Sequence, residues 1–279
     1  MNVFYALLAL TAIILTGIAI RIIRRVEIHS EETPKSASGQ LGVAHTIASV
    51  FLYPLGFLGF TVALLILIPT VVLFSPRRTH WMVRLMARFI LLSIGVVVKV
   101  RGKEKLRRKK AFVLMFNHES IFDAILLGAV VYRYVTALGA AYQFKLPLWG
   151  ALLRRWGIIE IPRKKLHAAK QSIEMAKEML QRGIPVYVAP EGTRTTTGRM
   201  REFKKGPFHL VRGAEADILP MVFRGAFQIK RKTDWRLKPG IVHIDVGDFI
   251  LYEDYRDMSI EELQAYVRKQ LRRMKGEIA

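Results

Sequence analysis

The chain of 279 residues contains no cysteine, which excludes disulfides, thiolate metal sites and a cysteine nucleophile. Its hydrophobic content of 52% and mean hydropathy of +0.24 are high for a soluble protein, while its formal net charge is +22. Residues 1–75 hold four basic and three acidic residues, a net charge of +1, and the other 204 hold 40 basic and 19 acidic residues, a net charge of +21. The composition predicts a membrane anchor followed by a basic domain drawn to an anionic lipid surface or nucleic acid. The apolar front favours lipid, so no nucleic acid is expected.

The first apolar run covers residues 3–20, which are 18 uncharged residues, near the minimum for a membrane-spanning helix. A cleaved signal peptide is disfavoured because no Lys or Arg precedes the run. Three arginines follow it instead, Arg21, Arg24 and Arg25, and the positive-inside rule places that end in the cytoplasm. We therefore expect an integral membrane protein with its basic domain on the cytoplasmic side, the inner membrane if the source is bacterial.

A second apolar run extends over residues 43–74 and is interrupted by Pro54 and Gly56, with Gly59 close behind and Pro69 later. As a straight helix it would be about 48 Å long, too long for a hydrocarbon core of about 30 Å without strong tilt. The run could form either one kinked span or a re-entrant hairpin that enters and leaves by the same face. The hairpin is preferred, because it keeps the basic domain on the same side as Arg21–Arg25. The predicted division is thus an anchor over 1–75 and a domain over 76–279.

Residues 80–98 have the pattern of an amphipathic helix, with Arg84 and Arg88 four residues apart on one face. Such a segment suits a helix that lies at the membrane interface with its arginines among the lipid headgroups. It could equally be an ordinary first helix of the domain.

From residue 111 onward, short β-rich runs alternate with longer helical ones, as expected for an α/β domain with a mostly parallel central sheet flanked by helices. The expected strands are 111–116, 158–162, 185–189, 218–223 and 241–247, and the expected helices are 122–133, 164–183, 204–214 and 259–275.

Two polar clusters directly follow expected strands, "NHES" at 117–120 and "PEGTR" at 190–194, and Arg163 follows a third. Ligands of parallel sheets bind where loops leave the carboxyl ends of the strands, so these residues can share one site. His118 there would act as a base and Asp123 as the carboxylate that orients it, while arginines bind phosphate well. Individually, each residue also has a structural interpretation, such as Asp123 in a helix capping box.

The motifs resemble those of the glycerolipid acyltransferases, specifically the lysophosphatidic acid acyltransferases. "NHESIFD" is similar to their Asn-His-x4-Asp block and "PEGTR" to their Glu-Gly-Thr-Arg block. The segments "GIIEIPRKK", "FKKGPFHL" and "ILPMV" continue the resemblance in family order over about residues 111–225.

The resemblance implies transfer of an acyl group from a thioester to the sn-2 hydroxyl of 1-acylglycerol-3-phosphate, with phosphatidic acid as the product. It assigns His118 as the general base and Asp123 as its orienting carboxylate. It also places five residues around the acceptor and its phosphate: Arg163, Glu191, Gly192, Thr193 and Arg194. The expected partners are anionic membrane lipids, the lysophospholipid acceptor and an acyl-CoA or acyl carrier protein donor, with no metal and no other cofactor.

One segment departs from the family pattern. Members commonly carry a basic residue and a glutamate ahead of "FKLP", where this chain has the uncharged "GAAYQ" at 139–143. The acceptor could therefore be another lysophospholipid or a lyso-ornithine lipid. The same residues are also compatible with a lipid hydrolase that uses His118 with water, or with a non-catalytic protein that binds anionic lipid.

Overall fold

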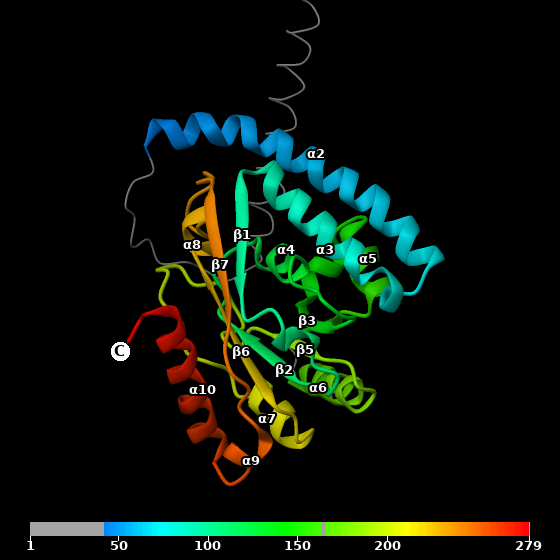
Figure 1. Cartoon of the computed structure of the whole chain (residues 1–279), viewed down its shortest axis with the longest axis vertical. Helices are drawn as coiled ribbons and strands as arrows, with labels where there is room; N and C mark the ends of the chain where they lie inside the picture. The colour runs from blue at the N-terminus through cyan, green and yellow to red at the C-terminus, as the bar shows by residue number, and fades with distance from the viewer. Residues whose placement is uncertain (1–41, 163–165, 279) are drawn as a thin grey trace, which may run out of the picture.

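A computed structural model describes residues 42–162 and 166–278. Within them a single sheet has the strand order β1-β7-β6-β2-β5-β3-β4 (Figure 1). Neighbouring strands are parallel except at the β6–β7 pair, so β1 and β7 run opposite to the other five. The predicted fold, a mostly parallel sheet flanked by helices, is confirmed. The strands are β1 (Val96–Arg101), β2 (Val113–Phe116), β3 (Thr136–Ala140), β4 (Ile159–Ile161), β5 (Val186–Val188), β6 (Ile218–Arg224) and β7 (Gly240–Val246).

The α-helices of the described residues are α2 (Val43–Leu73), α3 (Pro76–Ser93), α4 (Asp123–Gly128), α5 (Trp149–Trp156), α6 (Leu166–Gln181), α7 (Gly206–Gly213), α8 (Ala226–Ile229), α9 (Tyr252–Tyr255) and α10 (Ile260–Lys275). Two short 3-10 helices, η1 (Lys105–Arg107) and η2 (Ala141–Lys145), complete the connections.

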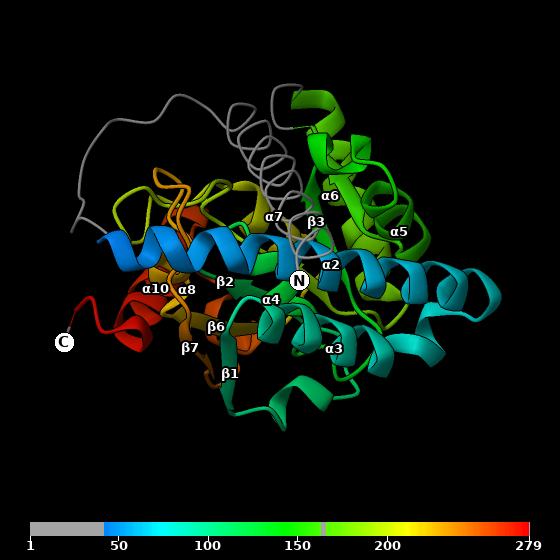
Figure 2. The same cartoon turned by 90° about the horizontal axis from the view of Figure 1, so that it is seen from above.

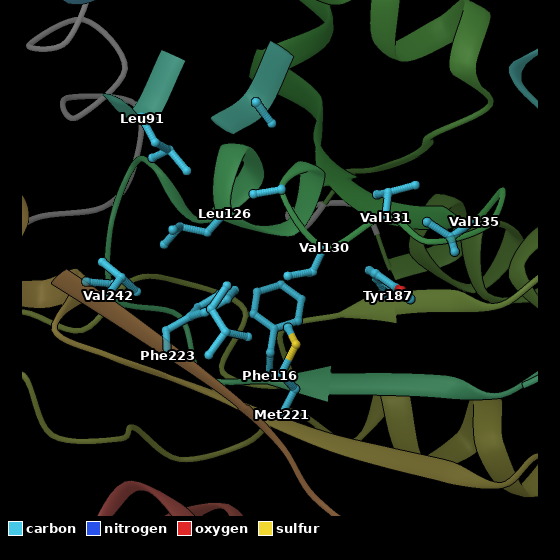
Figure 3. Close-up of a cluster of buried hydrophobic side chains, with 14 of the residues drawn as sticks. Leu91, Phe116, Leu126, Val130, Val131, Val135, Tyr187, Met221, Phe223 and Val242 are labelled. Carbon is cyan, nitrogen blue, oxygen red and sulfur yellow. The ribbon is translucent and has the colours of Figure 1, made fainter. Parts of the chain in front are cut away.

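Alternate residues of the central strands are buried on opposite faces of the sheet, as the two-residue repeat of a strand requires. Val113 and Met115 of β2 belong to a core beneath α6, α7 and α10. Leu114 and Phe116 belong to the core on the other face, beneath α2, α3, α4 and α5. Figure 3 shows Phe116 beside Met221 and Phe223 of β6 in this second core. Both faces of the sheet are therefore covered, which explains why its central strands are almost wholly apolar.

The prediction of a re-entrant hairpin over 43–74 is wrong, because Val43–Leu73 is one continuous helix that lies along α3 (Figures 1 and 2). The glycines that suggested a turn instead allow α3 to approach closely. A Cβ atom on Gly56 would lie 2.3 Å from the Cγ2 of Ile94, and one on Gly59 would lie 2.7 Å from the Oγ of Ser93. Of the described helices, only α2 is long and apolar enough to cross a membrane. The N-terminal span predicted for residues 3–20 lies outside the described residues.

The amphipathic segment predicted for residues 80–98 is correct for its first part only. Helix α3 begins at Pro76 and ends at Ser93, and Val96–Val98 belong to the edge strand β1. The arginines of α3 also have a different environment from the one predicted. Arg84 donates a hydrogen bond to the Val131 carbonyl and Arg88 donates one to the Ala129 carbonyl, each with a length of 3.3 Å. Both arginines therefore bind the chain at or just after the end of α4 and do not stand free among headgroups.

Candidate active site

His118 and Asp123 meet at the carboxyl end of β2. His118 lies in the loop after the strand and Asp123 is the first residue of α4, which is the arrangement expected from their spacing. The Nδ1 of His118 is 2.6 Å from the Oδ2 of Asp123. Since a carboxylate only accepts hydrogen bonds, Nδ1 carries the proton and Nε2 is left as a proton acceptor. The pair therefore has the geometry of a general base and its orienting carboxylate.

Asp123 also organises the loop in which His118 lies. Its carboxylate accepts hydrogen bonds from the backbone N–H of Glu119, at 2.7 Å, and of Ser120, at 3.1 Å. Asn117 anchors the beginning of the same loop to β6, because its side chain exchanges two hydrogen bonds with the backbone of Phe223. Both Asn117 and Asp123 are buried, so this loop is held from two sides.

Glu191 joins the His118 loop to the loop that follows β5. Its Oε1 accepts the backbone N–H of His118 at 2.7 Å, and its Oε2 accepts the backbone N–H of Arg201 at 2.8 Å. The N–H of Thr195 in turn donates to the His118 carbonyl at 2.9 Å. Burial raises the pKa of Glu191 to about 8, because it disfavours the ionised carboxylate. The two polar clusters that follow β2 and β5 thus form one hydrogen-bonded unit.

His118 and Asp123 line a cavity of about 1690 Å³. Its apolar part is built by α2, α3 and α5, and includes Phe60, Leu64, Leu67, Ala87, Ile90 and Leu152. Its polar part includes a group of basic side chains: Lys145, Lys170, Arg201, Lys204, Lys205 and His209. One cavity therefore offers an apolar wall, a set of cations and a histidine–aspartate pair.

Only some of the predicted binding residues line the cavity in the part of the chain that the structure describes. Glu191, Gly192 and Thr193 line the cavity, whereas Arg194 is buried, with a relative exposure of 4%, and lies outside the lining. Arg163 lies outside the described residues. The roles of Arg163 and Arg194 at a phosphate remain predictions.

The basic residues of the cavity were not among the predicted site residues. The segment "FKKG", which holds Lys204 and Lys205, was part of the family resemblance and was the available signal. Lys145 and Lys170 lie on η2 and α6, where a basic residue is ordinarily a solvated surface group, and only the fold brings them to the cavity.

The His–Asp loop and the basic residues that line the cavity lie within a segment that matches a known protein family, whereas the apolar wall from α2 and α3 precedes that segment. Residues 97–224 match the family model described as Acyltransferase, a range that runs from β1 to the end of β6 and includes His118, Asp123 and residues 191–194. This match confirms the resemblance inferred from the motifs.

Particular relatives carry more specific names. The chain is 32% identical over 166 residues to the 1-acyl-sn-glycerol-3-phosphate acyltransferase alpha of Homo sapiens, a match that covers 58% of each chain. It is 26% identical over 181 residues to the 1-acyl-sn-glycerol-3-phosphate acyltransferase of Cocos nucifera, covering 64% of this chain and 57% of the relative. The matches thus span less than two thirds of the length of these relatives.

The fold also has a counterpart among solved structures. The 1-acyl-sn-glycerophosphate (LPA) acyltransferase of Thermotoga maritima matches with a TM-score of 0.72 and 20% sequence identity. The match covers 84% of this chain and 96% of that one, so the likeness in fold extends well beyond the motif-bearing segment.

Proposed function

We propose that this protein is a membrane acyltransferase that moves a fatty acyl group from a thioester to the sn-2 hydroxyl of 1-acylglycerol-3-phosphate, forming phosphatidic acid. The observation that carries the proposal is the His118–Asp123 pair, 2.6 Å apart, in a cavity with both an apolar wall and a basic group of side chains. A lysophospholipid has the same division, one acyl chain and one anionic headgroup. The names of the relatives support this choice of acceptor.

The proposed reaction uses His118 as a base while the acceptor and the thioester are bound together. Nε2 of His118 removes the proton of the acceptor hydroxyl as its oxygen attacks the thioester carbonyl. Asp123 stabilises the imidazolium that forms, as the aspartate of a hydrolase triad does. The carbon–sulfur bond then breaks, and the thiolate leaves with the proton from the imidazolium. A general base positioned in this way contributes about 10²–10⁴-fold to the rate.

The basic side chains of the cavity are suited to the phosphate of the acceptor. Lys204 and Lys205 lie in the loop directly before α7, and Lys170 lies on α6, so cations from two separate parts of the chain line the same cavity. This arrangement would take the place of the basic residue that the "GAAYQ" segment lacks. The donor is acyl-CoA or an acyl carrier protein thioester, both of which present phosphate or carboxylate groups to a basic protein.

The outer faces of α2 and α3 support a location at a membrane. Exposed apolar side chains cover both helices, among them Phe51, Leu55, Leu58 and Leu65 on α2, and Trp81, Leu85, Phe89 and Leu92 on α3. The opposite side of α2 packs on the domain, where Tyr53 stacks on Trp235 and Phe60 contacts Trp149. Because α2 is bound to the domain at both places, we propose that the helix pair lies in the interface rather than crossing the bilayer. The cavity wall formed by α2 then lies beside the lipid phase.

The test is acyl transfer by the purified full chain in detergent micelles, with lysophosphatidic acid and an acyl thioester, followed by mass spectrometry of phosphatidic acid. We expect His118→Ala to lose about 10²-fold or more of the rate, since the base is removed. The matched control is His243→Ala, because His243 is exposed on β7 and should leave the rate unchanged. Near-normal transfer by His118→Ala would disprove the mechanism. Thioester cleavage that does not depend on an acceptor would instead identify a hydrolase.

A further inference from the structure

The end of α10 reaches the loop that carries His118, although more than 150 residues separate them in the sequence. Lys275, the last residue of α10, places its Nζ 2.6 Å from the Oε1 of Glu119 and 2.9 Å from the Oε1 of Glu277. The same ammonium donates a hydrogen bond to the Gly198 carbonyl. Its side chain is only 10% exposed, so these contacts are largely removed from water.

Glu119 is the residue directly after His118, and its side chain is 2% exposed. Its Oε2 accepts the backbone N–H of Phe227 at 3.0 Å, and its own N–H donates to Asp123 at 2.7 Å. A buried carboxylate needs a counter-ion, because removal of one partner of a buried pair leaves a charge in a medium that solvates it poorly. Lys275 supplies that positive charge.

Glu277 gives the same segment a second contact with the site. Its Oε1 accepts the backbone N–H of Met200 at 2.8 Å, and Met200 precedes Arg201, whose N–H binds Glu191. The chain can turn back in this way because Gly276 adopts a left-handed conformation, with φ of +80°, at the end of α10. Residues 275–277 thereby touch both loops that Glu191 joins.

We infer that Lys275 is a positioning residue of the acyl-transfer site, and that it holds the His118–Asp123 loop in register with the loop at 191–201 by pairing with Glu119 and Glu277. This inference rests on the proposed function for its catalytic consequence. Lys275 is not among the residues that line the cavity, so it acts through the loops and not on the substrate. Displacement of catalytic groups by about 1 Å can reduce a rate about 10²-fold, so loss of this contact should affect turnover.

The experiment compares Lys275→Met with Lys275→Arg, the double variant Glu119→Gln/Lys275→Met, and the control Lys269→Met, since Lys269 is exposed on the same helix. We expect Lys275→Met to lower kcat about tenfold or more and to change the KM of both substrates less than about twofold, as for a group that acts only through catalytic geometry. Lys275→Arg should retain most of the rate because it keeps the charge. The double variant should stay about as slow as Lys275→Met, because it removes the uncompensated carboxylate but does not restore the bridge between the two loops.

A second measurement does not depend on the reaction. Backbone amide hydrogen exchange of residues 117–123 and 195–201 should become faster in Lys275→Met and stay unchanged in Lys269→Met. Unchanged exchange in both loops, or a double variant with the rate of the wild type, would overturn the inference. If the wild type shows no acyl transfer at all, the proposed function fails, while the exchange data still decide whether Lys275 positions the loops. If Lys275→Met does not fold, the comparison of wild type, Lys275→Arg and the double variant decides in its place.

Discussion

Glu191 connects two loops by hydrogen bonds and is also a residue of the cavity wall. Both of its oxygens accept backbone N–H groups, from His118 and from Arg201, and its side chain is almost wholly buried. The family resemblance implies a place for this glutamate in the acceptor pocket. The observed hydrogen bonds assign it a further task, which is to join the loop that holds His118 to the loop that precedes Lys204 and Lys205.

The raised pKa of Glu191 predicts how stability depends on pH. Since burial raises the pKa from the usual 4.5 to about 8, the folded protein binds a proton at Glu191 that the unfolded chain has already released in this range. The free energy of unfolding should therefore fall as the pH rises from about 5 to 8, by at most about 1.4 kcal/mol per pH unit from this group.

The measurement is the free energy of unfolding of the wild type and of Glu191→Gln across this pH range. Glutamine does not titrate, so the stability of the wild type relative to the variant should decrease with rising pH. Glu119, whose pKa is also raised by burial, is present in both proteins, so its burial contributes to both stability curves. Two parallel stability curves would contradict the prediction.

At the residue scale, local contacts could be predicted and distant ones could not. His118 and Asp123 lie five residues apart at a strand-to-helix transition, so sequence spacing alone indicates that they can meet. The partner of Glu119 is Lys275, on a helix whose sequence reads as an ordinary amphipathic surface helix with basic residues in its last turn. No local pattern distinguishes Lys275 from its basic neighbours, because its role depends on how α10 packs against the sheet.

At the element scale, the packing of α2 on α3 depends on Gly56. At an exposed position inside a helix, replacing glycine by alanine stabilises the helix by about 1 kcal/mol. At position 56 the added methyl would lie 2.3 Å from the Cγ2 of Ile94, which is buried on a stiff β-branched side chain. We therefore expect Gly56→Ala to lower stability by about 1–3 kcal/mol, as overpacking does, and to lower the melting temperature in detergent. Gly42→Ala is the control, because nothing lies within 4 Å of its added methyl; a gain in stability at position 56 would disprove the close packing.

The outer face of α3 predicts which tryptophan enters the lipid. Trp81 is 50% exposed on α3, whereas Trp235 is only partly exposed and stacks on Tyr53 at the domain. Lipids with brominated acyl chains quench the fluorescence of tryptophans that lie at the depth of the bromine atoms. They should therefore quench the tryptophan fluorescence of the wild type. In Trp81→Phe much of this quenching should be lost. Trp235→Phe should lose little of it. Equal loss in the two variants would place the membrane face elsewhere.

The elements that could be predicted are those whose pattern is strong over many residues. Helices α6, α7 and α10 lie within three residues of the ranges expected for them, as do strands β2, β4, β5, β6 and β7. The single segment expected over residues 80–98 includes the start of β1, because apolar residues continue from α3 into the strand. Gly95, with φ of +71°, marks the boundary between them. Strand β3, "TALGA", has little strand propensity and forms because β5 and β4 pair with it on either side. The expected helix at 122–133 ends at Gly128.

For the whole molecule, the anchor and the domain are joined more closely than their compositions indicate. The sequence divides into an apolar front and a basic domain, yet α2 supplies Phe60, Ala63, Leu64 and Leu67 to the wall of the cavity in which His118 lies. The charge pattern could predict attraction to a membrane. It could not predict that the long apolar helix α2 also forms part of the cavity in which His118 lies, because that depends on which side of α2 packs on the sheet.

This shared wall has a consequence for substrate choice. Ala63 is fully buried on α2 and lines the cavity, so Ala63→Phe would place a ring in its apolar part. Each buried methylene group of an acyl chain is worth about 0.8 kcal/mol, so displacing two of them should reduce kcat/KM about tenfold or more. For thioesters with short acyl chains, which do not extend to the ring, kcat/KM should fall little. We therefore expect Ala63→Phe to lower the ratio of kcat/KM for long-chain to short-chain thioesters by about tenfold or more.

The control for this variant is Leu58→Phe, which places the same ring on the exposed side of the same helix. It adds apolar surface where lipid is expected and leaves the cavity untouched, so the ratio of long-chain to short-chain thioesters should stay as in the wild type. A uniform loss of activity for all chain lengths in Ala63→Phe would mean that the ring disturbs the catalytic loop and does not shorten the space for the chain. A change in the ratio for Ala63→Phe alone would establish that the acyl chain binds between α2 and the sheet, where the membrane-facing helix and the catalytic domain meet.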